Sequence, residues 1–153
     1  MSVDVRVETT IARPRAAVAS IMFDPKNDAA WTSGVIEVTP LTPGRLRAGS
    51  RVERKVHFMG RTFGYEYRVT SAGGDRFVEM EVDKPFPMKI RYELDDASSG
   101  TVARIHARGD ASGFFRIGGP LLGWMVRRSI AKDLAGLKAV VERERHLKCG
   151  VDS

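Results

Sequence analysis

The sequence contains one cysteine, Cys149, among 153 residues. A single thiol cannot form an intramolecular disulfide, and this usage is typical of a reducing compartment. The opening segment MSVDVRVETT lacks the basic stretch followed by an apolar one that marks a secretory signal. No apolar run reaches the roughly 18 to 20 residues of a membrane span, because Arg127 and Arg128 interrupt the most apolar stretch. We therefore predict a cytoplasmic protein.

The sequence also lacks the motifs that signal metal, nucleotide or acyl-enzyme chemistry. It has no HExxH or CxxC, and its histidines and acidic residues do not cluster with metal-ligand spacing. It has no GxSxG segment, and its glycine pairs in GGDRFVE and GGPLLG lack the spacing of nucleotide-binding loops. We expect no metal and no cofactor.

Positive charge is in moderate excess, with a formal net charge of +6. Part of it gathers in the C-terminal region as Arg127, Arg128, Lys132 and Lys138, before acidic residues interrupt the series. A solvated helix face explains this pattern better than nucleic-acid binding, so we expect no nucleic-acid partner. Transient contact with an acidic membrane is the alternative role for this face.

Alternation of apolar and polar residues, the pattern of strands with one covered face, recurs along the chain. It begins with Val3, Val5 and Val7. Further segments with this pattern or with strand composition, separated by turn-rich links, are VIEVTPL, SRVERKVHFMG, RTFGYEYRVT, RFVEMEVD, PMKIRYELDD and GTVARIHARGD. The sequence thus predicts an antiparallel sheet of about seven strands.

Helical patterns occupy the remaining segments. Pro14 is placed to begin a short helix, and a second short helix is expected to end at Gly34. A long helix is expected from Pro120, with one apolar stripe made of Leu122, Val126, Ile130, Leu134, Leu137, Val140 and Val141. A stripe of this length is explained by packing across the sheet, which predicts an α+β fold. We expect one domain over residues 1–153, with its core at about 3–144.

Several segments, taken in order, resemble a known family. They are VETTIARPRAAVASIMFDPKNDAAW, WTSGV, LRAGSRVERKV, GRTFGYEYRVT, SSGTVARI and GGPLLGWMVRRSIAKDLAGLKAVVE. The chain resembles polyketide cyclase/dehydrase-like members of the START/Bet v 1-like superfamily, which have the helix-grip fold. The resemblance implies a curved sheet wrapped around the C-terminal helix, enclosing an apolar cavity for a lipid-like or aromatic ligand. Enzymes, carriers and receptors share this fold, so the fold alone does not fix the function.

The inward faces of the predicted strands and helix supply the candidate ligand-binding residues. They are Trp31, Arg54, Phe63, Tyr65, Tyr67, Met80, Met88, Ile90, Tyr92, Ala103, Ile105, Val126, Ile130 and Asp133. A mostly apolar lining with a few polar groups is typical of ligand sites. A close-packed core without a cavity is the alternative interpretation of the same pattern.

Two charged residues interrupt the inward faces. Asp133 lies near the middle of the helix stripe, and Arg54 shares a strand face with Val52 and Val56. Because a buried carboxylate needs a donor, we expect Asp133 to contact Arg54, Tyr67 or Tyr92. The set would then be either a structural ion pair or a polar group that holds or protonates a ligand.

The tryptophans allow two interpretations each. Trp31 would be either a gate at the cavity mouth or a hydrophobic plug. Trp124 would lie on the surface with Phe114 and Phe115, as an exposed patch, an entrance portal or a dimer contact, unless a kink at Gly123 turns it inward.

We therefore predict a protein that binds a hydrophobic small molecule between sheet and helix. An aromatase/cyclase or dehydratase acting on a polyketide-type substrate is the alternative, and a protein-interaction module using the basic face is a third. The sequence identifies no catalytic residue, and it leaves open whether the protein is a monomer or a homodimer.

Overall fold

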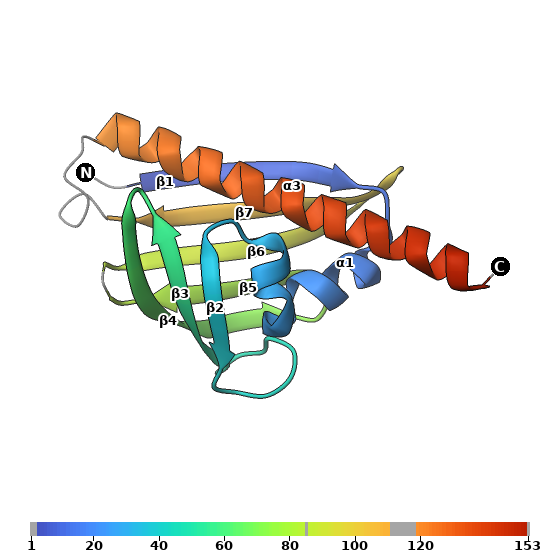
Figure 1. Cartoon of the computed structure of the whole chain (residues 1–153), viewed down its shortest axis with the longest axis horizontal. Helices are drawn as coiled ribbons and strands as arrows, with labels where there is room; N and C mark the ends of the chain where they lie inside the picture. Colours follow the sequence, from blue (N-terminus) through green and yellow to red (C-terminus); the bar gives the residue numbers. More distant parts are fainter. Residues whose placement is uncertain (1–2, 85, 111–118, 153) are drawn as a thin grey trace.

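The computed structural model describes residues 3–84, 86–110 and 119–152, and of residues 119 and 144–152 it describes the backbone alone. Seven strands form one antiparallel sheet in the order β1-β7-β6-β5-β4-β3-β2 (Figure 1). The strands are β1 (Val3–Ile11), β2 (Val35–Pro40), β3 (Arg51–Phe58), β4 (Arg61–Gly73), β5 (Phe77–Val82), β6 (Met88–Ala97) and β7 (Gly100–Gly109). The predicted α+β fold with a seven-stranded sheet is confirmed.

The alternation seen in the sequence sets the two faces of the sheet. In β5, Val78, Met80 and Val82 are buried, whereas Glu79 and Glu81 between them are partly exposed. Registers shift within the β2–β3 and β4–β5 pairs, between Val35 and Glu37 and between Val69 and Ser71. Such irregularities bend strands and increase their twist, so they help the sheet to curve around one face.

Two short helices and a 3₁₀ turn follow β1, and one long helix ends the chain. They are α1 (Arg15–Met22), η1 (Pro25–Asn27), α2 (Asp28–Trp31) and α3 (Gly119–Asp152). Pro14 caps α1, as predicted. The expectation that the second helix ends at Gly34 was wrong: it ends at Trp31, because Thr32 is extended, with φ −87° and ψ 123°. This early end places Ser33 outside the helix, facing α3.

Helix α3 lies across one face of the sheet and covers it (Figure 1). The predicted stripe is confirmed: Leu122, Ile130, Leu134, Leu137 and Val141 are buried, and Val126 and Val140 pack against that core. Basic side chains fix the helix to the edge strand β1. Arg127 Nη1 donates to the carbonyl of Arg6 at 3.0 Å, and Lys138 Nζ donates to that of Thr10 at 2.9 Å.

No helix within the described residues is both long enough and apolar enough to span a membrane. The segment with Phe114 and Phe115 lies outside the described residues, as do the side chains of His146 and Cys149.

The close approach of α2 to α3 generates a stability prediction. A Cβ added to Gly136 on α3 would lie 2.6 Å from the carbonyl oxygen of Trp31, so a side chain there would force α2 and α3 apart. We expect Gly136→Ala to lower the free energy of unfolding by about 1–3 kcal/mol, as overpacking does. Urea denaturation measures this change.

Gly123, on the same helix, is the matched control. A Cβ there would meet no atom within 4 Å. Gly123→Ala should therefore stabilise the protein by up to about 1 kcal/mol, because alanine has the higher helix propensity. Equal stabilisation by both substitutions would show that α2 and α3 are not packed this closely.

Candidate functional site

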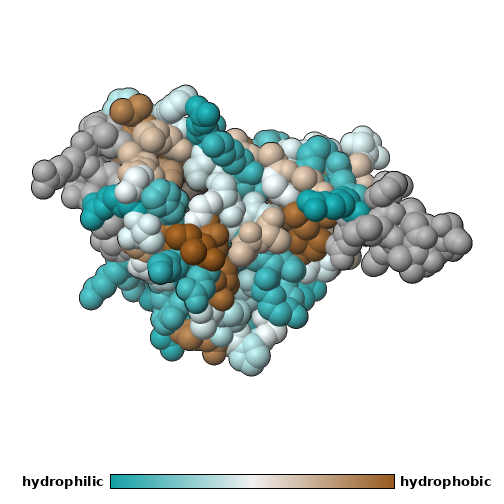
Figure 2. Space-filling model, in the orientation of Figure 1, coloured by the Kyte–Doolittle hydropathy of each residue, from teal (hydrophilic) through white to brown (hydrophobic). Residues whose placement is uncertain are grey.

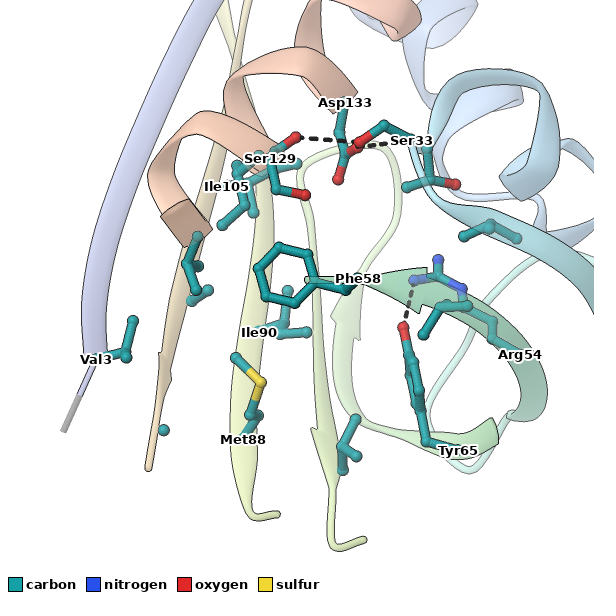
Figure 3. A pocket seen from close by; sticks show the side chains of 18 of the residues that line it. Val3, Ser33, Arg54, Phe58, Tyr65, Met88, Ile90, Ile105, Ser129 and Asp133 are labelled. Atoms are coloured by element: carbon teal, nitrogen blue, oxygen red, sulfur yellow. Dashed lines mark hydrogen bonds between the residues drawn. The ribbon is translucent and has the colours of Figure 1, made fainter. Parts of the chain in front are cut away.

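A cavity of about 180 Å³ lies between α3 and the concave face of the sheet (Figure 3). Most of its wall is apolar: Val3, Val35, Val56, Phe58, Phe63, Val82, Phe86, Met88, Ile90, Ile105, Ala107, Leu122, Val126 and Ile130. The polar residues in its wall are Thr32, Ser33, Arg54, His57, Tyr65, Tyr92, Ser129 and Asp133. The interior is therefore hollow rather than close-packed, and its polarity is concentrated in a few groups.

The structure brings most of the sequence-predicted residues to this wall. Those that line the cavity are Arg54, Phe63, Tyr65, Met88, Ile90, Tyr92, Ile105, Val126, Ile130 and Asp133. The remaining four, Trp31, Tyr67, Met80 and Ala103, are at most 2 % exposed and belong to the packed core instead. Alternation assigns a residue to the covered face of a strand, but it does not tell whether empty space or another side chain lies above it.

Trp31 packs behind the cavity wall as a hydrophobic plug. Its ring meets that of Tyr92 edge-on, with centroids 5.6 Å apart. Tyr92 in turn faces the cavity. Trp31 thus supports a wall residue from behind instead of lining the cavity.

Sequence reasoning missed Ser33, Ser129, Phe58 and Phe86 as wall residues. A signal existed for two of them. Ser129 lies one helical turn before Asp133, and Phe58 continues the inward alternation of Val56. Ser33 and Phe86 lie in irregular segments, where no periodicity indicates the direction of a side chain.

The polar residues of the wall gather at one side of the cavity, which we call its polar end. A buried ion pair, Arg54 with Asp28, lies there. Arg54 on β3 donates from Nη2 and Nε to Oδ2 of Asp28, at 2.7 and 3.1 Å, and both side chains are almost wholly buried. The hydroxyl of Tyr67 donates to the same oxygen at 2.9 Å. Asp28 was missed from the sequence, although a cation on a buried strand face requires a carboxylate partner.

Arg54 also contacts two tyrosines of the wall. Its Nη1 donates to the Tyr65 hydroxyl at 3.1 Å, and its Nη2 lies 3.4 Å from the Tyr92 hydroxyl. Burial, which disfavours the tyrosinate form, raises the pKa of Tyr92 well above its usual range. Tyr92 therefore stays a neutral phenol at physiological pH.

Asp133 has a different partner from the expected ones. Its Oδ1 accepts from the backbone N–H of Ser33 at 2.6 Å and from the Ser33 hydroxyl at 2.7 Å (Figure 3). The prediction that Arg54, Tyr67 or Tyr92 donates to it was wrong, because Arg54 and Tyr67 donate to Asp28 instead. Burial raises the pKa of Asp133 to about 6, against the opposing effects of the Ser33 bonds and the charge of Arg54.

An open groove of about 390 Å³ adjoins the cavity. It shares Ser33, His57, Phe58 and Ser129 with the cavity wall and is further lined by Gly34, Met59, Trp124, Met125, Arg128 and Lys132. Trp124 is 55 % exposed, so it does not turn inward at Gly123. Met59 has a φ of 53°, uncommon for a residue other than glycine, at the tip of the β3–β4 hairpin beside the groove.

The Arg54–Asp28 pair generates a second stability prediction. Asp28→Ala leaves Arg54 buried and without its carboxylate partner, so we expect the free energy of unfolding to fall by about 3–5 kcal/mol. Replacing both partners, as Asp28→Leu with Arg54→Met, should recover most of that loss. Denaturant titration of the three proteins gives both values.

An exposed pair provides the control. Asp75 accepts from Arg45 at 3.0 Å near the surface. Asp75→Ala should change the stability by no more than about 1 kcal/mol. If Asp28→Ala were equally mild, the buried pair would not be holding α2 against the sheet.

Comparison with known proteins places these features in context. A family model described as polyketide cyclase/dehydrase and lipid transport matches residues 2–142. No curated protein matches the sequence. Among solved structures, a START superfamily protein from Mycobacterium smegmatis has a TM-score of 0.76 and 15% identity, over 93% of this chain and 97% of that chain.

Two further structures share the fold. The ZhuI aromatase/cyclase from Streptomyces sp. R1128 has a TM-score of 0.76 and 16% identity, over 94% of this chain and 95% of that chain. Ara h 8.0201 has a TM-score of 0.69 and 10% identity, over 94% of this chain and 99% of that chain. The helix-grip, Bet v 1-like architecture expected from the sequence is confirmed.

Proposed function

Because the chain belongs to the polyketide cyclase/dehydrase and lipid transport family, we propose that it binds a lipid-like or aromatic small molecule between α3 and the sheet. The observation that carries this proposal is the cavity itself, which has a mainly apolar wall and a few convergent polar groups. That combination is the usual composition of a small-molecule site.

The dimensions of the cavity support a small guest. Its volume of about 180 Å³ is comparable with an apolar protein cavity of about 150 Å³ that accepts benzene. Each Å² of apolar ligand surface removed from water contributes about 25 cal/mol, before the entropy lost on association is subtracted. One or two aromatic rings, or a short alkyl chain, therefore match the enclosed part of the site.

Filling the cavity should weaken ligand binding. Ala107 on β7 lines the cavity and is 1% exposed. We expect Ala107→Phe to place its ring in the cavity and weaken binding of the fluorescent probe N-phenyl-1-naphthylamine at least ~10-fold. The protein should stay folded, because the ring enters space that no side chain fills, and larger side chains in a protein interior typically cost about 1–3 kcal/mol.

Arg108→Phe is the matched control, because it adds the same ring to the exposed face of the same strand. Probe affinity should be unchanged in this variant. The proposal fails if folded Ala107→Phe binds the probe as tightly as the unaltered protein does.

A second candidate function is catalysis in the same cavity, as an aromatase/cyclase or dehydratase. The raised pKa of Asp133, about 6, favours it, because a general acid or base works best with a pKa near the ambient pH. Tyr65 and Arg54 would hold a substrate carbonyl. Mass spectrometry distinguishes the two functions: a polyketide-type compound incubated with the protein is recovered unchanged from a carrier and cyclised or dehydrated by an enzyme.

Contact with an acidic membrane would explain why apolar and basic side chains are exposed together on α3 beside the groove. Leu121 and Trp124 on α3 are 52 % and 55 % exposed, and Figure 2 shows apolar surface at this end of the helix. The guanidinium of Arg128 lies 5.5 Å from the Trp124 ring centre. Within the described residues neither Arg128 nor Lys132 forms an ion pair, so both charges are available to anionic headgroups.

Vesicle sedimentation tests this contact. We expect binding to vesicles of phosphatidylcholine mixed with phosphatidylserine, and much weaker binding to phosphatidylcholine alone. Arg128→Gln and Lys132→Gln should each reduce binding about fivefold, since each basic residue near an anionic surface contributes about 1 kcal/mol.

Two exposed residues elsewhere serve as controls, Lys26→Gln and Leu41→Ala. Both should bind as the unaltered protein does. Equal binding to the two vesicle types would remove the membrane contact from the account without affecting the cavity.

A further inference from the structure

The two charged groups in the polar end of the cavity differ in how they are compensated. Arg54 is paired with Asp28, and its Nη1 is engaged by Tyr65. Asp133 has no lysine, arginine or histidine in ion-pair contact within the described part of the chain. The uncompensated charge of the cavity is therefore negative, although the protein as a whole is basic.

The hydrogen bonds of Asp133 leave one of its oxygens available. Both donors of Ser33 go to Oδ1, and no described residue donates to Oδ2. Figure 3 shows the carboxylate at the α3 side of the cavity, with Asp133 directed from the helix toward the interior. An ionised carboxylate only accepts hydrogen bonds, so this oxygen is suited to a ligand group that donates.

We propose that Asp133 selects ligands by their polar end, admitting alcohols, phenols and amines and excluding carboxylates. This selection rests on the proposed function. A ligand carboxylate would bring a second negative charge beside Asp133 in a cavity of low polarity, where like charges repel strongly. It would gain little from Arg54, because Asp28 already binds that guanidinium through two nitrogens.

Tyr65 adds the complementary group. Its hydroxyl oxygen accepts from Arg54, so its proton is free to point to another acceptor. The polar end thus offers one acceptor, on Asp133, and one donor, on Tyr65. A ligand hydroxyl can donate to the first or accept from the second, whereas a carboxylate can only accept.

A series of ligands with one apolar body tests the selection. Naphthalene, 2-naphthalenemethanol, 2-naphthylmethylamine and 2-naphthoate are titrated by fluorescence at pH 7.5, where Asp133, with a pKa of about 6, is mostly ionised. We expect the alcohol and the amine to bind at least ~10-fold more tightly than naphthoate, the scale of a hydrogen bond to a charged group. This comparison uses the unaltered protein, so it does not depend on the folding of any variant.

Asp133→Asn then tests the residue. The amide oxygen still accepts from Ser33, but the charge is gone. Naphthoate should bind about tenfold more tightly to this variant, and the amine about tenfold more weakly. Asp75→Asn removes an exposed carboxylate instead and should leave all four affinities unchanged.

The outcomes separate the selection from the proposed function. If naphthalene binds and naphthoate binds as tightly as the alcohol, the cavity stands and the selection by Asp133 is overturned. The selection is also overturned if folded Asp133→Asn keeps the order of affinities of the unaltered protein. If none of the four compounds binds, the proposed function is overturned, and the selection with it.

Discussion

The buried ion pair between Arg54 and Asp28 is the interaction on which the arrangement of the site depends. A guanidinium on the covered face of a sheet is strongly destabilising unless a carboxylate reaches it. Asp28 reaches it from α2, which packs against β2 and α3. Trp31 and Ser33 follow from the same placement: the first supports Tyr92 from behind, and the second meets Asp133 on α3. One electrostatic requirement thus orders the loop, the wall and the helix together.

The same arrangement divides the cavity chemically. The side nearest β6, β7 and the first turns of α3 is apolar, with Met88, Ile90 and Ile105 in its wall. The polar side is built from the hydroxyls of Tyr65 and Tyr92, a compensated cation and one carboxylate whose burial raises its pKa. An apolar wall supplies affinity without direction, whereas the polar groups fix the orientation of a guest. The groove beside Trp124 and Met59 shares four wall residues with this interior: Ser33, His57, Phe58 and Ser129.

The sequence predicted the fold well, because its signals were local and repeated. The alternation along β5 and β6 and the apolar stripe of α3 indicate which face of each element is covered. Pro14 indicates where α1 begins. The site was predicted in part for the same reason: an inward position is visible, but a pairing between distant residues is not. Asp133 and Arg54 were both identified as inward-facing charges, but their partners were not. Ser33 lies in an irregular segment, and Asp28 begins a helix of four residues. Met80 and Ala103 show what alternation cannot predict. An inward side chain either lines a cavity or belongs to the packed core, and both of these residues belong to the core.

The central claim is that the space between α3 and the sheet holds an apolar guest. Native mass spectrometry of the gently purified protein, followed by solvent extraction, examines that space without choosing a ligand in advance. The account predicts a discrete one-to-one adduct that is released on denaturation and whose extract contains a hydrophobic molecule. A chain that carries only its own mass, and that acquires no adduct when apolar compounds are added, would contradict it.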